Sequence, residues 1–284
     1  MPELRIGTCS WKYESWKGIV YSGTSGGNFL SEYAEKFDTV EVDQWFWSLH
    51  AAERVSLPDP AVVLDYADSV PPDFRFSIKV PNSVTLTHFY RKTKSDLLVP
   101  NPHFLSKKIF RDFLKRIEPL GKKTGPLIFQ FEYLNKMKMP SQKAFQEVFG
   151  EFIRECPAGY RYGLEIRNPN YLNGEFFSFL DENGLHPVFL QGYYMPPVFD
   201  MVEKNGGLIR DLAVIRLHGP DREGIEERTG KVWDRIVDPK DEELERVAGT
   251  VKGLLARDVS VYLNVNNHYE GSAPLTIEKL RRLL

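Results

Sequence analysis

A short apolar run followed by a longer helix-compatible stretch recurs eight times along the chain. Each run is rich in β-branched or aromatic residues and ends in polar or charged ones. The runs are Leu4–Thr8, Thr39–Val42, Phe74–Val80, Leu127–Phe131, Tyr162–Ile166, Pro187–Leu190, Val214–Leu217 and Val259–Val265. Strand–helix alternation over about 250 residues predicts a (β/α)8 barrel, an α/β fold of the TIM-barrel type. We expect one domain that spans residues 1–284.

The intervals between the runs predict helices, because apolar residues recur there at helical spacing. The predicted helices are Phe29–Lys36, Ala61–Ser69, His103–Leu120, Ser141–Arg154, Gly174–Asn183, Asp241–Ala256 and Pro274–Leu283. Ser141 is expected to cap its helix. Three connections, Asn82–Pro102, Gln191–Leu212 and Gly219–Lys240, are interpreted as extended βα loops after the third, sixth and seventh strands. Loops of this length are expected to wall a binding site.

Polar side chains gather where the strands end, which is the end of such a barrel that carries its chemistry. Alternation along a strand puts Glu165 with Arg167 on one side, and Arg216 with His218. Burying such groups is costly unless they pair or meet a ligand. We predict Glu165, His218 and Glu41 as catalytic residues. The predicted substrate-binding residues are Arg167, Arg216, Lys79, Asp43, Asn266, Asn267 and Trp11.

These residue types favour acid–base chemistry. Glu165 or Glu41 would act as the base, and His218 as the proton donor, because an unperturbed histidine titrates near neutrality. The arginines and Lys79 predict an electropositive pocket and a small anionic ligand that carries a phosphate or a carboxylate. A hydrolase, lyase or isomerase without a cofactor fits this pattern. The alternative is a buried ion network in which the two glutamates neutralise Arg167 and Arg216.

A metal site is the other use for these side chains. Glu41, Asp43, Glu165, His218 and His268 would supply carboxylate and imidazole ligands. No HxH, HxxxH or DxD motif is present, and two arginines would lie beside the cation. We therefore expect no bound metal.

Composition limits the class of protein. The chain is 42% hydrophobic and has two cysteines, which argues against a disulfide framework and fits a cytoplasmic protein. No apolar run approaches the roughly 20 residues of a membrane span. A net charge of −2 does not favour nucleic acid as a partner. The basic and aromatic segment His88–Lys94 keeps open a noncatalytic module that binds nucleic acid or protein.

Several motifs occur in an order that resembles one protein family. They are IGTCSWKYESWKGIVY, YAEKFDTVEVDQWFWSL, FRFSIKVPNSVTL, GPLIFQF, GLEIRNPNY, VIRLHG and VYLNVNNHYEGSAP. Over nearly its whole length the chain resembles the DUF72 family, also called YecE-like proteins. The resemblance implies a TIM barrel and supplies no reaction. The chain departs from the usual family pattern at Asp43, where asparagine is common, and at Asn168, where histidine is common.

Overall fold

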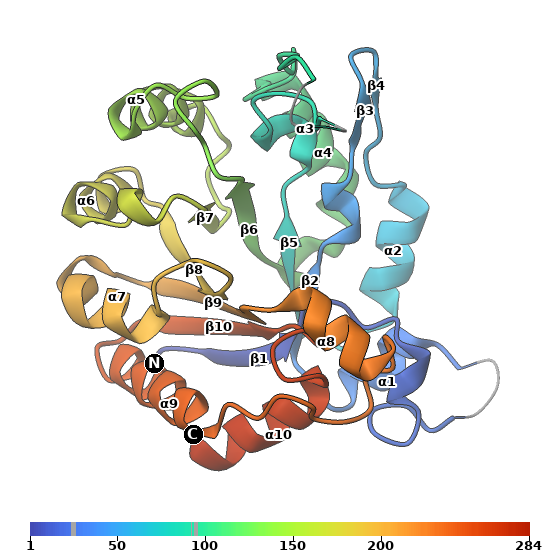
Figure 1. The fold of residues 1–284 in the computed structure, drawn as a ribbon. Coiled ribbons are helices and arrows are strands. Elements are labelled where there is room, and N and C mark those ends of the chain that lie inside the picture. Colours follow the sequence, from blue (N-terminus) through green and yellow to red (C-terminus); the bar gives the residue numbers. More distant parts are fainter. Residues whose placement is uncertain (24–26, 92, 94–95) are drawn as a thin grey trace.

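Eight parallel strands close into a barrel at the centre of the molecule, with helices around it (Figure 1). The computed structural model describes residues 1–23, 27–91, 93 and 96–284. The barrel strands are β1 (Leu4–Thr8), β2 (Thr39–Val42), β5 (Arg75–Lys79), β6 (Thr124–Phe131), β7 (Tyr162–Ile166), β8 (His186–Gly192), β9 (Leu212–Gly219) and β10 (Ser260–Val265). Each of the eight predicted runs overlaps one of these strands, so the predicted (β/α)8 barrel is confirmed.

Successive side chains of the strands face the helices and the barrel interior in turn. The main apolar core lies between strands and helices, where phenylalanines and branched residues pack. A separate and much smaller apolar cluster comprises Ile128, Val188, Leu212, Val214 and Tyr262. These five residues alternate in phase with the polar residues nearer the carboxyl ends of their strands, such as Gln130 and Arg216. The barrel interior is therefore apolar in its middle and polar above it.

The helices begin and end close to where the sequence predicts them. They are α1 (Phe29–Ala34), α2 (Pro60–Asp68), α4 (Lys107–Ile117), α5 (Gln142–Arg154), α6 (Gly174–Glu182), α9 (Asp241–Leu255) and α10 (Ala273–Leu283). The capping role of Ser141 is confirmed, because its Oγ accepts a hydrogen bond from the Ala144 amide at 3.1 Å. The third predicted helix starts late, at Lys107, because Ser106 caps it and Leu105 has a φ of 53°. None of the described helices is both long and apolar enough to span a membrane.

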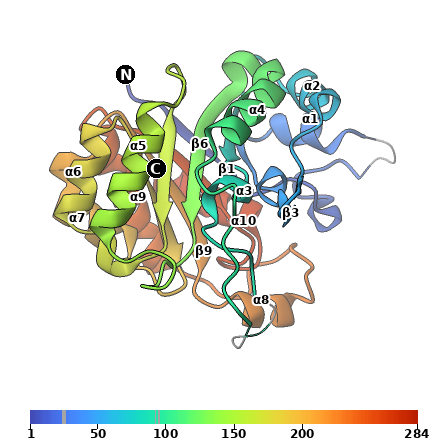
Figure 2. The same cartoon turned by 90° about the horizontal axis from the view of Figure 1, so that it is seen from above.

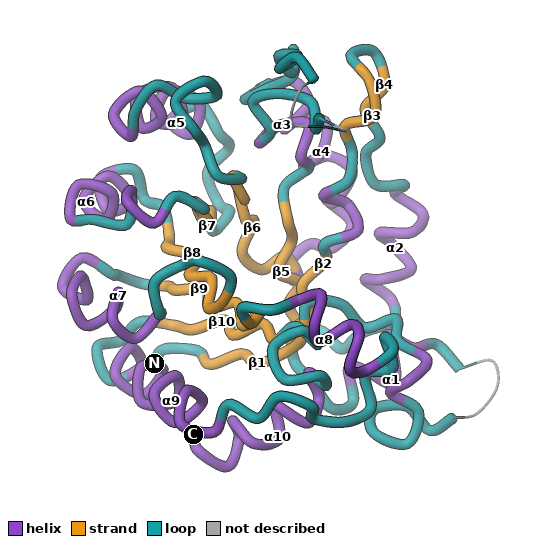
Figure 3. The backbone as a smooth tube through the Cα atoms, viewed as in Figure 1, coloured by secondary structure: helices purple, strands orange, loops and turns teal. Residues whose placement is uncertain are grey.

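The three extended connections are not simple loops, which corrects the sequence interpretation (Figure 3). They contain α3 (Asn82–Thr85), α7 (Val198–Asn205) and α8 (Arg222–Thr229), and the connection after β2 holds the small hairpin β3 (Leu49–Ala51) and β4 (Arg54–Val55). Each of these elements is too short to show a clear period in the sequence. Figure 2 shows α8 at the end of the molecule opposite the N-terminus.

Gly7 of β1 lies against the backbone of the neighbouring strand β2. A Cβ atom at Gly7 would lie 1.9 Å from the carbonyl oxygen of Thr39 on the neighbouring strand. We expect Gly7→Ala to lower the free energy of unfolding by about 3 kcal/mol or more, because two backbones must separate. The measurement is chemical denaturation followed by circular dichroism.

Gly249→Ala is the matched control, since a Cβ at this exposed position of α9 meets nothing within 4 Å. It should raise the free energy of unfolding by about 0.5–1 kcal/mol, because alanine favours the helix. Equal stabilities for the two variants would contradict the close contact of β1 and β2.

Candidate active site at the carboxyl ends of the strands

Arg216 is the centre of the polar layer. Its side chain on β9 is almost fully buried, with a relative exposure of 1% for the residue. The Nε and Nη2 groups each donate a hydrogen bond of 2.7 Å to one oxygen of Glu41 on β2. Nη1 donates to Glu165 on β7 and, at 3.2 Å, to Gln130 on β6. One guanidinium group therefore connects four strands of the barrel.

Glu165 joins the buried part of this network to the mouth of the barrel. Its second oxygen accepts a hydrogen bond of 2.8 Å from Nε of Arg167, whose side chain is 25% exposed. Burial alone would raise the pKa of Glu165, but the charges of Arg216 and Arg167 outweigh it and bring the pKa to about 2. The carboxylate therefore stays ionised. This is the ion network that the sequence left as the alternative use of these residues.

Lys79 is buried beside this network, over the ring of Phe46. The residue is 6% exposed, and its Nζ lies 4.0 Å from the centre of the Phe46 ring. Among the described residues none accepts a hydrogen bond from this nitrogen or forms an ion pair with it. Burial, and then the positive charge of Arg216, lower the pKa of Lys79 to about 8. Burial also raises the pKa of Asp43, which follows the neighbouring strand β2.

His218 lies two residues beyond Arg216, as the alternation predicts. Its Nε2 is 3.7 Å from the Sγ of Cys9, and its ring lies 5.9 Å from that of Tyr193. Burial, followed by the charges of Arg216, Arg167 and Lys79, lowers the pKa of His218 well below its ordinary value. The imidazole is neutral at pH 7, so a role as proton acceptor or neutral hydrogen-bond donor fits better than the cationic acid expected from the sequence. Burial also raises the pKa of the Cys9 thiol.

Three predicted binding residues have contacts outside the network. Asn266 accepts hydrogen bonds from the amide and the Nδ1 of His268, at 3.0 and 2.5 Å. Asn267 accepts from the Ala273 amide at 2.9 Å and so holds the start of α10. Trp11 is buried against the ring of Tyr66, with the ring centres 5.0 Å apart. The structure therefore gathers Glu41, Glu165, Arg167 and Arg216 by direct contacts, with Lys79, Asp43 and His218 beside them.

The carboxylates and imidazoles do not converge as metal ligands do. In the part of the chain that the structure describes, no three side chains of His, Cys, Asp or Glu form a group that would hold a metal ion. His268, one of the five candidate ligands, instead pairs with Glu226 of α8 at 3.0 Å.

Exposed aromatic side chains surround the mouth in two pairs. Trp47 lies 6.1 Å from Tyr90, and Tyr133 lies 6.4 Å from Tyr194, measured between ring centres. All four side chains are more than half exposed. Of the basic segment His88–Lys94, Lys92 and Lys94 lie outside the described residues.

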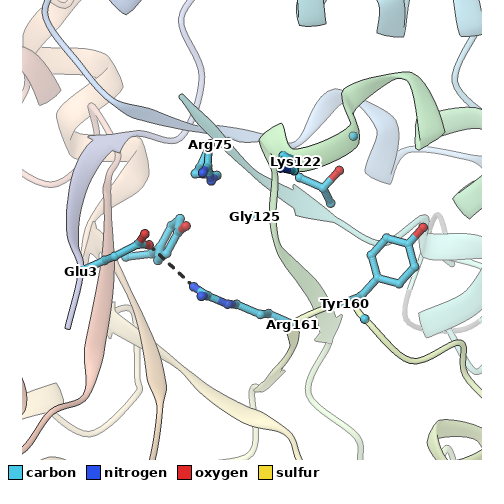
Figure 4. A pocket seen from close by; sticks show the side chains of 10 residues that line it. Glu3, Arg75, Lys122, Gly125, Tyr160 and Arg161 are labelled. Carbon is cyan, nitrogen blue, oxygen red and sulfur yellow. Dashed lines mark ion pairs between the residues drawn. The ribbon is translucent and has the colours of Figure 1, made fainter. Parts of the chain in front are cut away.

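A cavity of about 450 Å³ opens at the starts of the strands (Figure 4). Arg75, Lys122 and Arg161 line it together with Glu3. Arg161 pairs with Glu3 at 3.7 Å, and Arg75 donates to the carbonyls of Pro72 and Phe74. This end of a barrel usually serves stability rather than chemistry. We therefore place the candidate active site at the opposite end.

Sequence reasoning did not select two residues that complete the network. Gln130 stands opposite Glu165 in the register of β6 and β7, and Asn264 stands opposite Arg216 in that of β10 and β9. Asn264 donates to Glu41 at 3.4 Å. Both are polar residues near the carboxyl ends of their strands, and this position is visible in the sequence. Their pairing depends on register, which a single sequence does not show.

Comparison with known proteins identifies the family. The model of the family described as "Protein of unknown function DUF72" matches residues 5–284. The chain belongs to the DUF72 family. It is 28% identical over 186 residues to UPF0759 protein YecE of Escherichia coli strain K12, a match that covers 64% of this chain and 55% of that protein. The chain thus spans about half the length of this DUF72 relative.

Two solved DUF72 structures share the fold. A DUF72 family protein from Enterococcus faecalis is 19% identical with a TM-score of 0.69, covering 99% of this chain and 95% of that one. Another, from Thermotoga maritima, is 22% identical with a TM-score of 0.65, covering 99% and 98%. At these identities the likeness shows the fold alone. The family description carries no activity.

Removing the central arginine tests the network. Arg216→Met leaves Glu41 and Glu165 buried without their cation, and we expect the free energy of unfolding to fall by about 3–5 kcal/mol. The exposed ion pair of Lys108 with Asp112 is the control, because Lys108→Ala should cost less than about 0.5 kcal/mol. Denaturant titration measures both, and a loss below 1 kcal/mol for Arg216→Met would contradict a structural role.

The pH dependence of stability tests the state of His218. The unfolded histidine binds a proton as the pH falls through about 6.5, while the folded one, with its lowered pKa, does not. The stability due to this residue is therefore present above that pH and lost below it. Between about pH 7.5 and 5.5 the wild type should lose roughly 1 kcal/mol more than His218→Asn.

The exposed His50 offers a control, and His50→Asn should follow the wild type. Denaturation curves at both pH values give the result. Parallel losses in the wild type and in His218→Asn would show that His218 titrates normally.

Proposed function

We propose that this DUF72 protein is an enzyme that performs acid–base chemistry on a small anionic substrate at the carboxyl-end mouth of the barrel. The observation that carries the proposal is a pair of cationic groups beside the buried network, Lys79 and Arg167. Nη1 and Nη2 of Arg167 form no hydrogen bond with other described residues. A guanidinium fork left open in this way suits a carboxylate or a phosphate.

The contacts within the network support a division of roles among the site residues. Arg216 already donates to Glu41, Glu165 and Gln130, so it holds the carboxylates in place instead of binding the ligand. Glu165 is a weak base at a pKa of about 2, because its two arginines stabilise the charge. We therefore assign Glu41 and Glu165 to positioning. Asp43, with its raised pKa, is the group suited to move protons, and neutral His218 is suited to donate a hydrogen bond.

The reaction class that fits is a hydrolase, lyase or isomerase that needs no redox cofactor. Arg167 would hold the anionic group, and the positive charges at the mouth would stabilise negative charge that develops during the reaction. The absence of a bound metal stays a prediction.

The rival function is a noncatalytic module for nucleic acid or protein, and the two exposed aromatic pairs favour it. Aromatic side chains in protein sites for single-stranded nucleic acid stack on bases of any type. Trp47 and Tyr90 are an exposed pair of this kind. In that case Tyr90→Ala should weaken binding of a single-stranded oligonucleotide, with a strong dependence on salt.

Anion binding distinguishes the two functions. Isothermal titration with phosphate and with pyruvate should show one site in the wild type. Arg167→Met should weaken it about tenfold to a hundredfold, the loss of a charged hydrogen-bond pair. Arg246→Met is the control, because Arg246 pairs with Asp200 on the outer helices. If neither anion binds, or if Arg167→Met binds as tightly as the wild type, the proposed anion site at Arg167 is wrong.

A further inference from the structure

The amine of Lys79 lies in surroundings that the proposed acid–base chemistry does not require. A lysine that only held an anion would be expected at a more exposed position, where its charge is solvated. Lys79 is instead more than nine-tenths buried at the end of β5, over the face of Phe46. Among the described residues it has no acceptor for its protons. Such a site disfavours the ammonium form.

We propose that Lys79 is a nucleophile that forms an imine with the carbonyl group of a small substrate that also carries a carboxylate or a phosphate. The inference rests on the proposed function, because it assigns the substrate class to the same site. Arg167 would hold the anionic group while Nζ of Lys79 attacks the carbonyl carbon.

Burial and the surrounding charges explain how about a tenth of Lys79 is a free amine at pH 7. Burial has the largest effect, and the cationic Arg216 adds to it, so the pKa falls to about 8. Three acidic groups act in the other direction: Glu41 on β2, Asp43 directly after that strand, and Glu165 on β7. Arg216 partly cancels two of them, because it is hydrogen-bonded to both glutamates. Desolvation beside another cation is a known way to activate a lysine.

Imine formation needs no cofactor, because the amine and the carbonyl compound lose only water. The lone pair of Nζ forms the N–C bond while the π electrons of the carbonyl move to oxygen, which gives a carbinolamine after one amine proton reaches that oxygen. The second amine proton follows, the oxygen leaves as water, and the N–C double bond remains. Asp43 is the group suited to carry these protons, because burial raises its pKa and it follows the strand next to β5. Protonation of the imine then makes an electron sink for a lyase or isomerase.

Reductive trapping tests the imine directly. The full chain is incubated at neutral pH with pyruvate or with dihydroxyacetone phosphate and sodium cyanoborohydride, whose hydride reduces the protonated imine to a stable secondary amine. We expect one adduct per chain, located at Lys79 by peptide mapping. It should form at least about tenfold faster than adducts at exposed lysines, since more of Lys79 is unprotonated. Adducts spread evenly over surface lysines, or none with either compound, would overturn the proposal.

Two matched substitutions assign the adduct. Lys79→Arg keeps a positive charge but cannot form the imine, so the fast adduct should disappear. Lys138→Arg should leave it unchanged, because Lys138 is also little exposed but pairs with Glu132 at 2.6 Å. Persistence of the fast adduct in Lys79→Arg would overturn the assignment.

A measurement on the wild-type protein tests Lys79 even if the Lys79 variant does not fold. Competitive acetylation with acetic anhydride at a series of pH values reports the titration of each lysine. We expect the labelling of Lys79 to have its midpoint near a pKa of about 8. A midpoint near that of model lysine, about 10.4, would overturn the proposal.

The anion site at Arg167 and the imine at Lys79 are tested separately by these measurements. If pyruvate binds and Arg167→Met weakens it, yet no adduct forms at Lys79, the anion site stands and the imine is excluded. If Lys79 is trapped equally well by pyruvate and by neutral acetone, and Arg167→Met changes neither rate, the imine remains but its preference for anionic substrates is overturned.

Discussion

The paired hydrogen bonds from Arg216 to Glu41 are the interaction on which the upper half of the barrel depends. Parallel N–H···O bonds of this kind fix both the distance and the plane of the two groups. They connect β9 to β2 across the barrel, and Glu165 extends the connection to β7. A barrel interior is normally filled by branched apolar residues. Here a polar layer replaces them, and it is tolerable because nearly every member has a partner.

This layer also sets the electrostatics of the mouth. Arg216 and Arg167 stabilise the charge of Glu165, while burial and then the same two arginines lower the pKa of His218. The pKa of Lys79 is also lowered, first by burial and then by the charge of Arg216. The groups whose protons remain adjustable therefore lie around the network and not within it. A rigid charged centre with adjustable neighbours is an arrangement that suits catalysis.

The walls of the mouth come from the segments between strands and outer helices. Glu226 of α8 pairs with His268, which in turn bonds Asn266 just beyond β10, so α8 is attached to the end of the barrel. The exposed aromatic pairs come from four different connections, those after β2, β5, β6 and β8. The opposite end has a cavity, but its arginines are engaged by Glu3 and by backbone carbonyls (Figure 4). The two ends of the barrel therefore differ both in the segments that surround them and in the partners of their charged side chains.

The sequence by itself determined the eight strands, most of the helices and the end of the barrel at which polar groups gather, because strand and helix periods are local properties. It did not reveal α7 or α8, since eight-residue helices between proline or glycine residues show too little period. Only the tertiary structure decided the pairing of Arg216 with Glu41 and Glu165, which depends on strand register around a closed barrel. It also decided the protonation of His218 and Lys79, because burial and the charges of residues distant in sequence set both.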